Sequence, residues 1–193
     1  MTFYSFAKSL VNLALKPVYR IEVIGKENIP SEGGVLLCAN HINNMDPLAV
    51  GITSVRPVHF MAKDELFSVP VIGTIVRNVN AFPVKRGMSD REALRKGLAV
   101  LKEGHVLGLF PEGTRSKTGE IGKGQAGAGF FALRSDAHIV PCAIIGPYKA
   151  FGKLKVVYGK PIEMESVREN KMNAEQTTDI IMNEIQKLIT QYK

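Results

Sequence analysis

The fold of this chain is decided first by an apolar run that opens into a polar loop, Val35-Leu36-Leu37-Cys38-Ala39-Asn40-His41-Ile42-Asn43-Asn44-Met45-Asp46-Pro47. The run at 35–39 has the length and the apolar composition of a buried strand. An imidazole, His41, follows the run closely, and the carboxylate of Asp46 comes five residues later. A candidate base and a carboxylate that can orient it therefore stand together at the end of one predicted strand.

A second apolar run, at 106–110, also opens into a polar turn, and the turn reads Phe110-Pro111-Glu112-Gly113-Thr114-Arg115-Ser116. It places a carboxylate, a hydroxyl and a guanidinium close together. A guanidinium matches phosphate oxygens with two parallel hydrogen bonds, so we interpret the turn as an anion-binding corner. The same residues also fit a tight turn in which Gly113 supplies a positive φ and the charges form an exposed ion pair.

Further short β-rich runs alternate with helical patterns along the chain. The predicted strands are 20–24, 35–39, 59–62, 79–84, 106–110, 139–145 and 154–158, and the predicted helices include 89–103, 126–134 and a closing helix with an apolar stripe at 180–189. Ser89 and Glu92 stand at capping-box spacing, and Gly104 marks the end of that helix. The alternation predicts an α/β fold, a mostly parallel mixed sheet flanked by helices, with sites where strand ends enter loops.

Residues 1–18 predict an amphipathic helix. Its apolar positions are Phe3, Phe6, Leu10, Leu13 and Val18, and Lys8 and Lys16 lie between them. Such a helix either packs on the domain or lies in a membrane interface. The basic chain favours the membrane. We therefore expect two units, an amphipathic membrane-interface helix at 1–18 and a single α/β domain at 19–193.

The composition describes one folded domain with an anionic partner. The chain has 193 residues, a formal net charge of +7 and no Trp. Its basic residues are scattered and not interleaved with aromatics, so nucleic acid is not the expected partner. Cys38 and Cys142 lie in apolar runs without ligand spacing, so we expect no disulfide and no metal site. No apolar run reaches the length of a spanning helix, and the N-terminus lacks a cleavable signal pattern.

The two motifs together are far more specific than either alone. Asn40-His41 with Asp46, followed by the Phe110 to Ser116 turn, resembles the glycerophospholipid acyltransferase family, and most closely its 1-acylglycerol-3-phosphate acyltransferase branch. Two further blocks match in order and approximate spacing, Phe82-Pro83-Val84-Lys85-Arg86-Gly87 and Ile139-Val140-Pro141-Cys142-Ala143-Ile144. The family often carries serine at position 43, where this chain has Asn43. That departure concerns hydrogen bonding within the loop and leaves the roles of His41 and Asp46 intact.

The resemblance implies roles for eight residues. His41 and Asp46 would be catalytic, and the substrate-binding residues would be Lys63, Arg86, Glu112, Gly113, Thr114 and Arg115. The three cations would hold the phosphate, while Glu112 would position the acceptor or hold one of the arginines. A second role stays open for Asp46, because Asp followed by Pro47 is a typical helix N-cap. One carboxylate can serve both purposes.

The resemblance also implies an activity. The enzyme would move a fatty acyl group from an acyl thioester, on acyl carrier protein or CoA, to the free hydroxyl of 1-acylglycerol-3-phosphate, giving phosphatidate, and would need no cofactor or metal. We expect it on the cytoplasmic face of the cell membrane as a peripheral protein. The alternatives are an acyltransferase acting on glycerol-3-phosphate or another lysophospholipid, a hydrolase, and a non-catalytic lipid-binding module.

Overall fold

The structure is a computed structural model of the chain. It describes residues 8–9, 12–13, 18–70, 72–78, 80–85, 90–116 and 118–193. Three apolar positions of the expected N-terminal helix, Phe3, Phe6 and Leu10, lie outside the described residues, and so does Arg86 of the expected phosphate site.

Seven strands form one sheet in the order β1-β7-β6-β2-β5-β3-β4. All neighbouring pairs are parallel except β6 and β7, which are antiparallel and joined by a loop too short for a crossover helix. The predicted mostly parallel mixed sheet is therefore confirmed. The strands are β1 (Arg20–Ile24), β2 (Val35–Ala39), β3 (Val58–Lys63), β4 (Ala81–Val84), β5 (Val106–Leu109), β6 (His138–Ile145) and β7 (Lys153–Tyr158).

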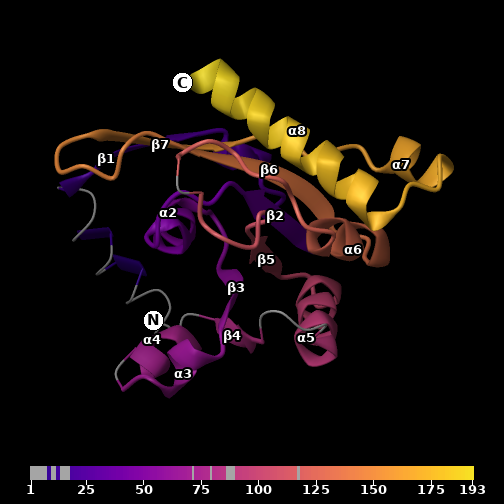
Figure 1. Cartoon of the computed structure of the whole chain (residues 1–193), viewed down its shortest axis with the longest axis horizontal. Helices are drawn as coiled ribbons and strands as arrows, with labels where there is room; N and C mark the ends of the chain where they lie inside the picture. Colours follow the sequence, from indigo (N-terminus) through magenta and orange to yellow (C-terminus); the bar gives the residue numbers. More distant parts are fainter. Residues whose placement is uncertain are drawn as a thin grey trace.

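Helices flank the sheet on both faces. Figure 1 shows α8 and α2 on opposite sides of β6 and β2. None of the helices in the described part of the chain is long and apolar enough to cross a membrane. The helical elements are η1 (Lys26–Asn28), α2 (Asp46–Thr53), α3 (Glu65–Ser68), α4 (Ile72–Asn78), α5 (Arg91–Lys102), α6 (Gly127–Arg134), α7 (Glu165–Glu169) and α8 (Ala174–Tyr192).

Strand β2 contributes to two apolar layers because successive side chains point to opposite faces of a sheet. Leu36 and Cys38 belong to the cluster on the α6 and α8 face. Val35, Leu37 and Ala39 belong to the cluster on the α2 face. All five side chains are buried, which explains why the strand reads as a continuous apolar run rather than an alternating one.

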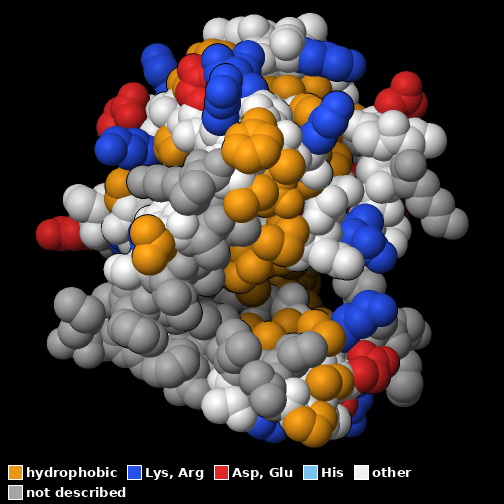
Figure 2. Space-filling model, turned by 90° about the vertical axis from the view of Figure 1, so that its left-hand side faces the viewer, with side chains coloured by type: hydrophobic (Ala, Val, Ile, Leu, Met, Phe, Trp, Pro, Cys, Tyr) orange, Lys and Arg blue, Asp and Glu red, His pale blue; other side chains and the backbone are white. Residues whose placement is uncertain are grey.

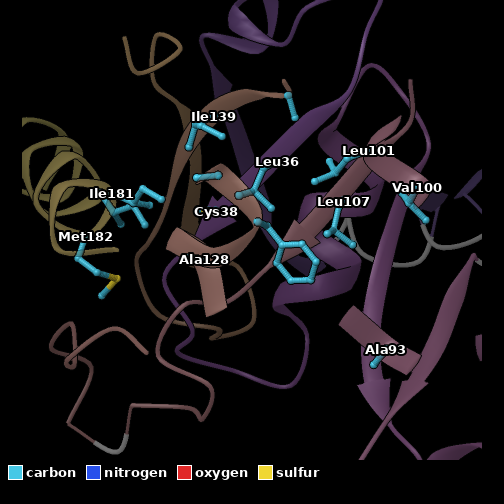
Figure 3. Close-up of a cluster of buried hydrophobic side chains, with 14 of the residues drawn as sticks. Leu36, Cys38, Ala93, Val100, Leu101, Leu107, Ala128, Ile139, Ile181 and Met182 are labelled. Carbon is cyan, nitrogen blue, oxygen red and sulfur yellow. The ribbon is translucent and has the colours of Figure 1, made fainter. Parts of the chain in front are cut away.

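The cluster on the α6 and α8 face joins the sheet to the closing helix. Figure 3 shows Leu36, Cys38 and Ile139 of the sheet facing Ile181 and Met182 of α8. The predicted apolar stripe of this helix is thus confirmed, since Ile181 and Ile185 are fully buried. This packing holds the far half of the chain against β2 and so fixes the strand from which His41 departs.

Helix α5 begins one residue later than the capping-box spacing predicted. Its N-cap is Asp90, whose side chain accepts a hydrogen bond from the backbone N–H of Ala93 at 3.0 Å. Both Ser89 and Asp90 are good capping residues. The capping-box spacing between Ser89 and Glu92 pointed to Ser89, whereas Asp90 is the observed N-cap. The predicted stop is confirmed: Gly104 follows the helix with φ +80°, a conformation that glycine adopts without strain.

The carboxyl ends of four neighbouring parallel strands, β2, β5, β3 and β4, meet at one edge of the sheet. His41 follows β2, Glu112 follows β5, and Lys63 ends β3. Loops at such an edge converge, and α/β proteins commonly place their sites there. The sheet order therefore brings the two motifs together although 71 residues separate His41 from Glu112.

Candidate active site

The two sequence motifs are joined through the main chain of His41. Its N–H donates to Glu112 Oε1 at 2.8 Å, and its carbonyl oxygen accepts a hydrogen bond from the N–H of Ser116 at 2.7 Å. Strands β2 and β5 pair in register, Cys38 opposite Leu109, so the loops that follow them start side by side. The turn after β5 thus fixes the backbone position of the proposed base.

His41 and Asp46 form a direct pair. The ring nitrogen Nδ1 of His41 lies 2.8 Å from Asp46 Oδ2, with side chains 12% and 0% exposed, respectively. The imidazole is also stacked on the Phe110 ring, at 4.2 Å between centroids and 21° between planes. Its second nitrogen, Nε2, has no hydrogen-bond partner in the described part of the chain. A carboxylate on Nδ1 selects the tautomer in which Nε2 is the free acceptor, which is the state that a general base needs.

The Asp46 carboxylate faces the loop before it and not the helix after it. Oδ2 also accepts from the N–H groups of Ile42 and Asn43, both at 2.7 Å. Asp46 is the first residue of α2, and the helix has no side-chain cap. The alternative role as an N-cap is therefore wrong. The Pro47 that follows Asp46 suggested that role, but the Asp46 carboxylate instead accepts hydrogen bonds from the loop that carries His41.

Asn43, the departure from the family pattern, has a local role in this loop. Its side-chain Oδ1 accepts from the N–H of Met45 at 3.0 Å, and its carbonyl oxygen accepts from the N–H of Asp46 at 3.1 Å. The side-chain bond is an Asx-type turn, which serine forms more weakly. The substitution therefore preserves the turn before α2.

Tyr148 belongs to this site and was missed in the sequence. It lies in the loop after β6, and its hydroxyl donates to Asp46 Oδ1 at 2.7 Å. Burial first, and then the neighbouring Asp46 carboxylate, raise the pKa of the Tyr148 phenol, so it stays protonated as a donor. The ring of Tyr19 packs edge-on against it at 5.6 Å. Asp46 is thus held on one oxygen by Tyr148 and on the other by His41 and the loop.

Replacing Tyr148 with phenylalanine should lower kcat by about tenfold and leave KM for both substrates unchanged, because only the placement of the His41–Asp46 pair is disturbed. The free energy of unfolding should fall by about 1–3 kcal/mol with the lost bond to a charged group. Steady-state kinetics and chemical denaturation measure the two effects. Tyr192→Phe, at the end of α8, is the matched control. A raised acceptor KM with normal kcat would mean that Tyr148 binds substrate instead.

Glu112 makes contacts that were not expected from the sequence, which suggested that it would position the acceptor or hold an arginine. The residue is 5% exposed, and both carboxylate oxygens accept backbone hydrogen bonds: Oε1 from His41 and Oε2 from Gly122 at 2.9 Å. It therefore ties the main chain of His41 to the loop at 118–126, and among the described residues it contacts no arginine. Gly113 next to it has φ +68°, a conformation that strains residues with a Cβ, so the turn favours glycine. The predicted positive φ at Gly113 is confirmed.

The expected phosphate ligands leave neighbouring strand ends. Lys63 ends β3 and Arg115 follows β5, both with exposed side chains. Within the described residues neither side chain forms an ion pair or a hydrogen bond, so both charges are available to an anion. Thr114 is exposed beside Arg115. The exposed ion pair suggested for this turn is not formed, because Glu112 points inward.

The two thiols lie outside the chemistry of the site. Cys38 and Cys142 are both fully buried, and burial raises the pKa of each thiol. A thiol that stays protonated and inaccessible is not a nucleophile. The interpretation of both as core residues is confirmed.

This arrangement is typical of one class of protein: α/β enzymes with a paired His and Asp at a strand end and exposed cations beside them. Comparison with known families matches residues 20–145 to the acyltransferase family. The chain belongs to that family.

Individual relatives agree with this assignment. A 1-acyl-sn-glycerol-3-phosphate acyltransferase of Bacillus subtilis (strain 168) is 32% identical over 166 residues, covering 82% of each chain. A chloroplastic 1-acyl-sn-glycerol-3-phosphate acyltransferase of Arabidopsis thaliana is 29% identical over 174 residues, and the match covers 83% of this chain and 49% of the plant protein. The crystal structure of the 1-acyl-sn-glycerophosphate acyltransferase PlsC from Thermotoga maritima superimposes with a TM-score of 0.78 at 22% identity, covering 96% of this chain and 79% of that one. The last comparison shows a common fold.

Proposed function

We propose that this acyltransferase moves a fatty acyl group from a carrier thioester to the free hydroxyl of 1-acylglycerol-3-phosphate and so makes phosphatidate in phospholipid synthesis. The observation that carries the proposal is the hydrogen-bonded His41–Asp46 pair, whose Nε2 has no partner among the described residues and lies at the same sheet edge as Lys63 and Arg115. The similarity to proteins named for this activity supports the choice of acceptor.

The proposed reaction is a direct transfer. His41 Nε2 takes the proton of the acceptor hydroxyl as its oxygen attacks the thioester carbonyl carbon. The buried Asp46 carboxylate stabilises the imidazolium that results. When the tetrahedral intermediate collapses, the carbon–sulfur bond breaks and His41 returns the proton to the leaving thiolate. No enzyme nucleophile is needed, in keeping with the burial of both thiols.

One assay separates this function from its rivals. The purified protein is given an acyl thioester with 1-acylglycerol-3-phosphate, glycerol-3-phosphate, another lysophospholipid or no acceptor, and thiol release and lipid products are both followed. Release that depends on 1-acylglycerol-3-phosphate supports the proposal. Thiol release with another acceptor would show an acyltransferase of different acceptor specificity. Thiol release without an acceptor would show a hydrolase, and no release with any donor would indicate a non-catalytic binding module. Acyl carrier protein and CoA thioesters, compared in parallel, identify the donor.

Arg115 provides the sharpest test of the phosphate site. Arg115→Ala should raise the acceptor KM by about tenfold or more and leave the donor KM unchanged, because a charge-assisted bond to phosphate is lost. Arg115→Lys should recover only part of the loss, since lysine cannot make two parallel bonds. The control is Lys160→Ala, an exposed cation just after β7, a strand that β6 and β2 separate from β5. Equal rises in both Michaelis constants would rule out a phosphate role.

We also propose that the enzyme is peripheral to the cytoplasmic face of the cell membrane and that residues 1–18 contribute to its attachment. The formal charge of +7 and the 74% exposure of Leu13 support this. One contact favours packing on the domain instead: Lys8 Nζ donates to the carbonyl oxygen of Ser54 at 2.6 Å, and burial lowers the pKa of Lys8. Packing on the domain and membrane attachment are compatible if Lys8 faces the domain and Leu13 faces the lipid.

A further inference from the structure

The loop between β6 and β7, residues 146–152, presents an exposed aromatic side chain at its tip. Phe151 is 73% exposed and has φ +63°. It lies in a tight turn closed by a hydrogen bond from the N–H of Gly152 to the carbonyl oxygen of Lys149 at 2.8 Å. A positive φ is unfavourable for a bulky residue, and an exposed ring gains nothing from the core. Neither folding nor turn formation explains a phenylalanine at this position.

Basic side chains surround the ring. Lys149 and Lys153 flank it in sequence, and the N–H of Arg20 donates to the carbonyl oxygen of Gly152 at 3.1 Å, which places β1 beside the tip. Lys153 is paired with Glu22 at 2.6 Å. The side chains of Lys149 and Arg20 are exposed and have no acidic partner in the part of the chain that the structure describes. The tip is therefore an aromatic residue with uncompensated positive charge around it.

The tip also adjoins other exposed apolar surface. The N–H of Phe151 donates to the carbonyl oxygen of Val18 at 2.7 Å, and Val18 is 39% exposed. Figure 2 looks onto this side of the molecule, toward the β6–β7 loop that projects at the left of Figure 1, and shows a stripe of hydrophobic side chains with Lys and Arg on both sides of its upper end. Three residues before Phe151, Tyr148 holds Asp46. The tip and the active site thus share one loop.

We infer that this tip, formed by Phe151 with Val18, Lys149 and Arg20, docks on an anionic lipid bilayer and inserts the Phe151 ring at the headgroup level. Aromatic rings are favoured at that depth, and cations next to the surface are attracted by anionic lipid. Because the same loop reaches Asp46, docking would place the active site at the bilayer surface. This contact adjoins the proposed attachment through residues 1–18, which it meets at Val18, and adds the β6–β7 loop to it. The membrane contact itself does not depend on the proposed function. Only the idea that docking gives access to a lipid acceptor rests on it.

Vesicle flotation of the full chain tests the inference. Wild type should bind vesicles of phosphatidylcholine with phosphatidylglycerol and bind phosphatidylcholine alone weakly. Phe151→Asn should lower the partition constant by roughly tenfold or more, the loss expected for one phenylalanine side chain. Asparagine tolerates positive φ, so this variant keeps the turn. Met172→Asn is the matched control: Met172 is a partly exposed apolar residue between α7 and α8, at the other end of the molecule from the β6–β7 loop (Figure 1), and should leave binding unchanged.

Fluorescence gives a second measurement that does not depend on loss of binding. The chain contains no Trp, so Phe151→Trp introduces a single reporter. Its emission should shift to the blue and be quenched by brominated lipid when anionic vesicles are added, while Met172→Trp should show neither change. Flotation of Phe151→Asn at the wild-type level, or a tryptophan at position 151 that stays in water on bound protein, would overturn the inference.

Two further comparisons separate this inference from the others. A Phe3→Ser/Phe6→Ser variant measures the share of binding due to residues 1–18; if it abolishes binding and Phe151→Asn has no effect, the tip makes no contact. Phe151→Asn should keep wild-type activity on a short-chain, water-soluble acceptor. If it instead raises KM for an acyl carrier protein donor and binds vesicles normally, the tip docks the donor. Vesicle binding needs no turnover, so it decides the inference even if the proposed acceptor is wrong.

Discussion

Replacing His41 with alanine is expected to lower kcat/KM by roughly 10²–10⁴-fold while the protein stays folded, because a positioned base contributes about that factor to a proton transfer. The fold should survive because His41 is held through its main-chain N–H and carbonyl, which alanine retains. Steady-state rates and a thermal melt measure the two properties. His138→Ala, an exposed imidazole at the amino end of β6, should behave as wild type. A His41→Ala enzyme with more than a tenth of wild-type activity would exclude His41 as the base.

Asp46→Asn, which changes the hydrogen-bond partner of His41, is also expected to lower the rate while the protein stays folded. The amide oxygen can still accept from His41 and the loop if the amide NH₂ faces Tyr148, whose hydroxyl can turn to accept. The geometry should therefore survive, but the neutral amide no longer stabilises the imidazolium, so the rate should fall by about 10²–10⁴-fold. The loss should be somewhat smaller than that of His41→Ala. Normal turnover with a lower melting temperature would reduce Asp46 to a structural residue.

The second large effect is expected at Glu112. In Glu112→Gln one of the two buried carboxylate oxygens becomes an NH₂ group that faces the N–H of His41 or Gly122. Two donors cannot bond each other, so one hydrogen bond is lost and a buried N–H is left unpaired. The free energy of unfolding should fall by about 1–3 kcal/mol. Because the His41 backbone shifts with it, kcat should fall as well.

Denaturant unfolding and kinetics on the same preparation distinguish this role from substrate binding. Glu120→Gln, an exposed carboxylate in the same loop, is the control and should change neither quantity. If Glu112→Gln instead raises the acceptor KM and unfolds at the wild-type denaturant concentration, the carboxylate contacts substrate and the backbone bonds are secondary.

Local patterns in the sequence were enough to predict the strands and the contact between His41 and Asp46. The apolar run before His41 marked β2, and the observed strand has the predicted bounds because a strand buried on both faces needs a continuous apolar run. His41 and Asp46 are five residues apart on one loop, so their contact needs no distant partner. The strand-end position of Lys63 and Arg115 also followed from the alternation of strands and helices. The boundary of α5 did not follow, because two adjacent capping residues compete and only the folded backbone chooses Asp90.

Tertiary structure alone decided what surrounds that pair. Glu112 meets the backbone of His41 across 71 residues, and Tyr148 meets Asp46 across 102 residues. Both contacts depend on the sheet order, which places β5 on one side of β2 and β6 on the other. Every non-proline residue has a backbone N–H. The sequence around His41 therefore gives no sign that its N–H bonds the Glu112 carboxylate. The sequence by itself determined which chemistry the chain carries, and the packing of three neighbouring strands determined which side chains hold that chemistry in place.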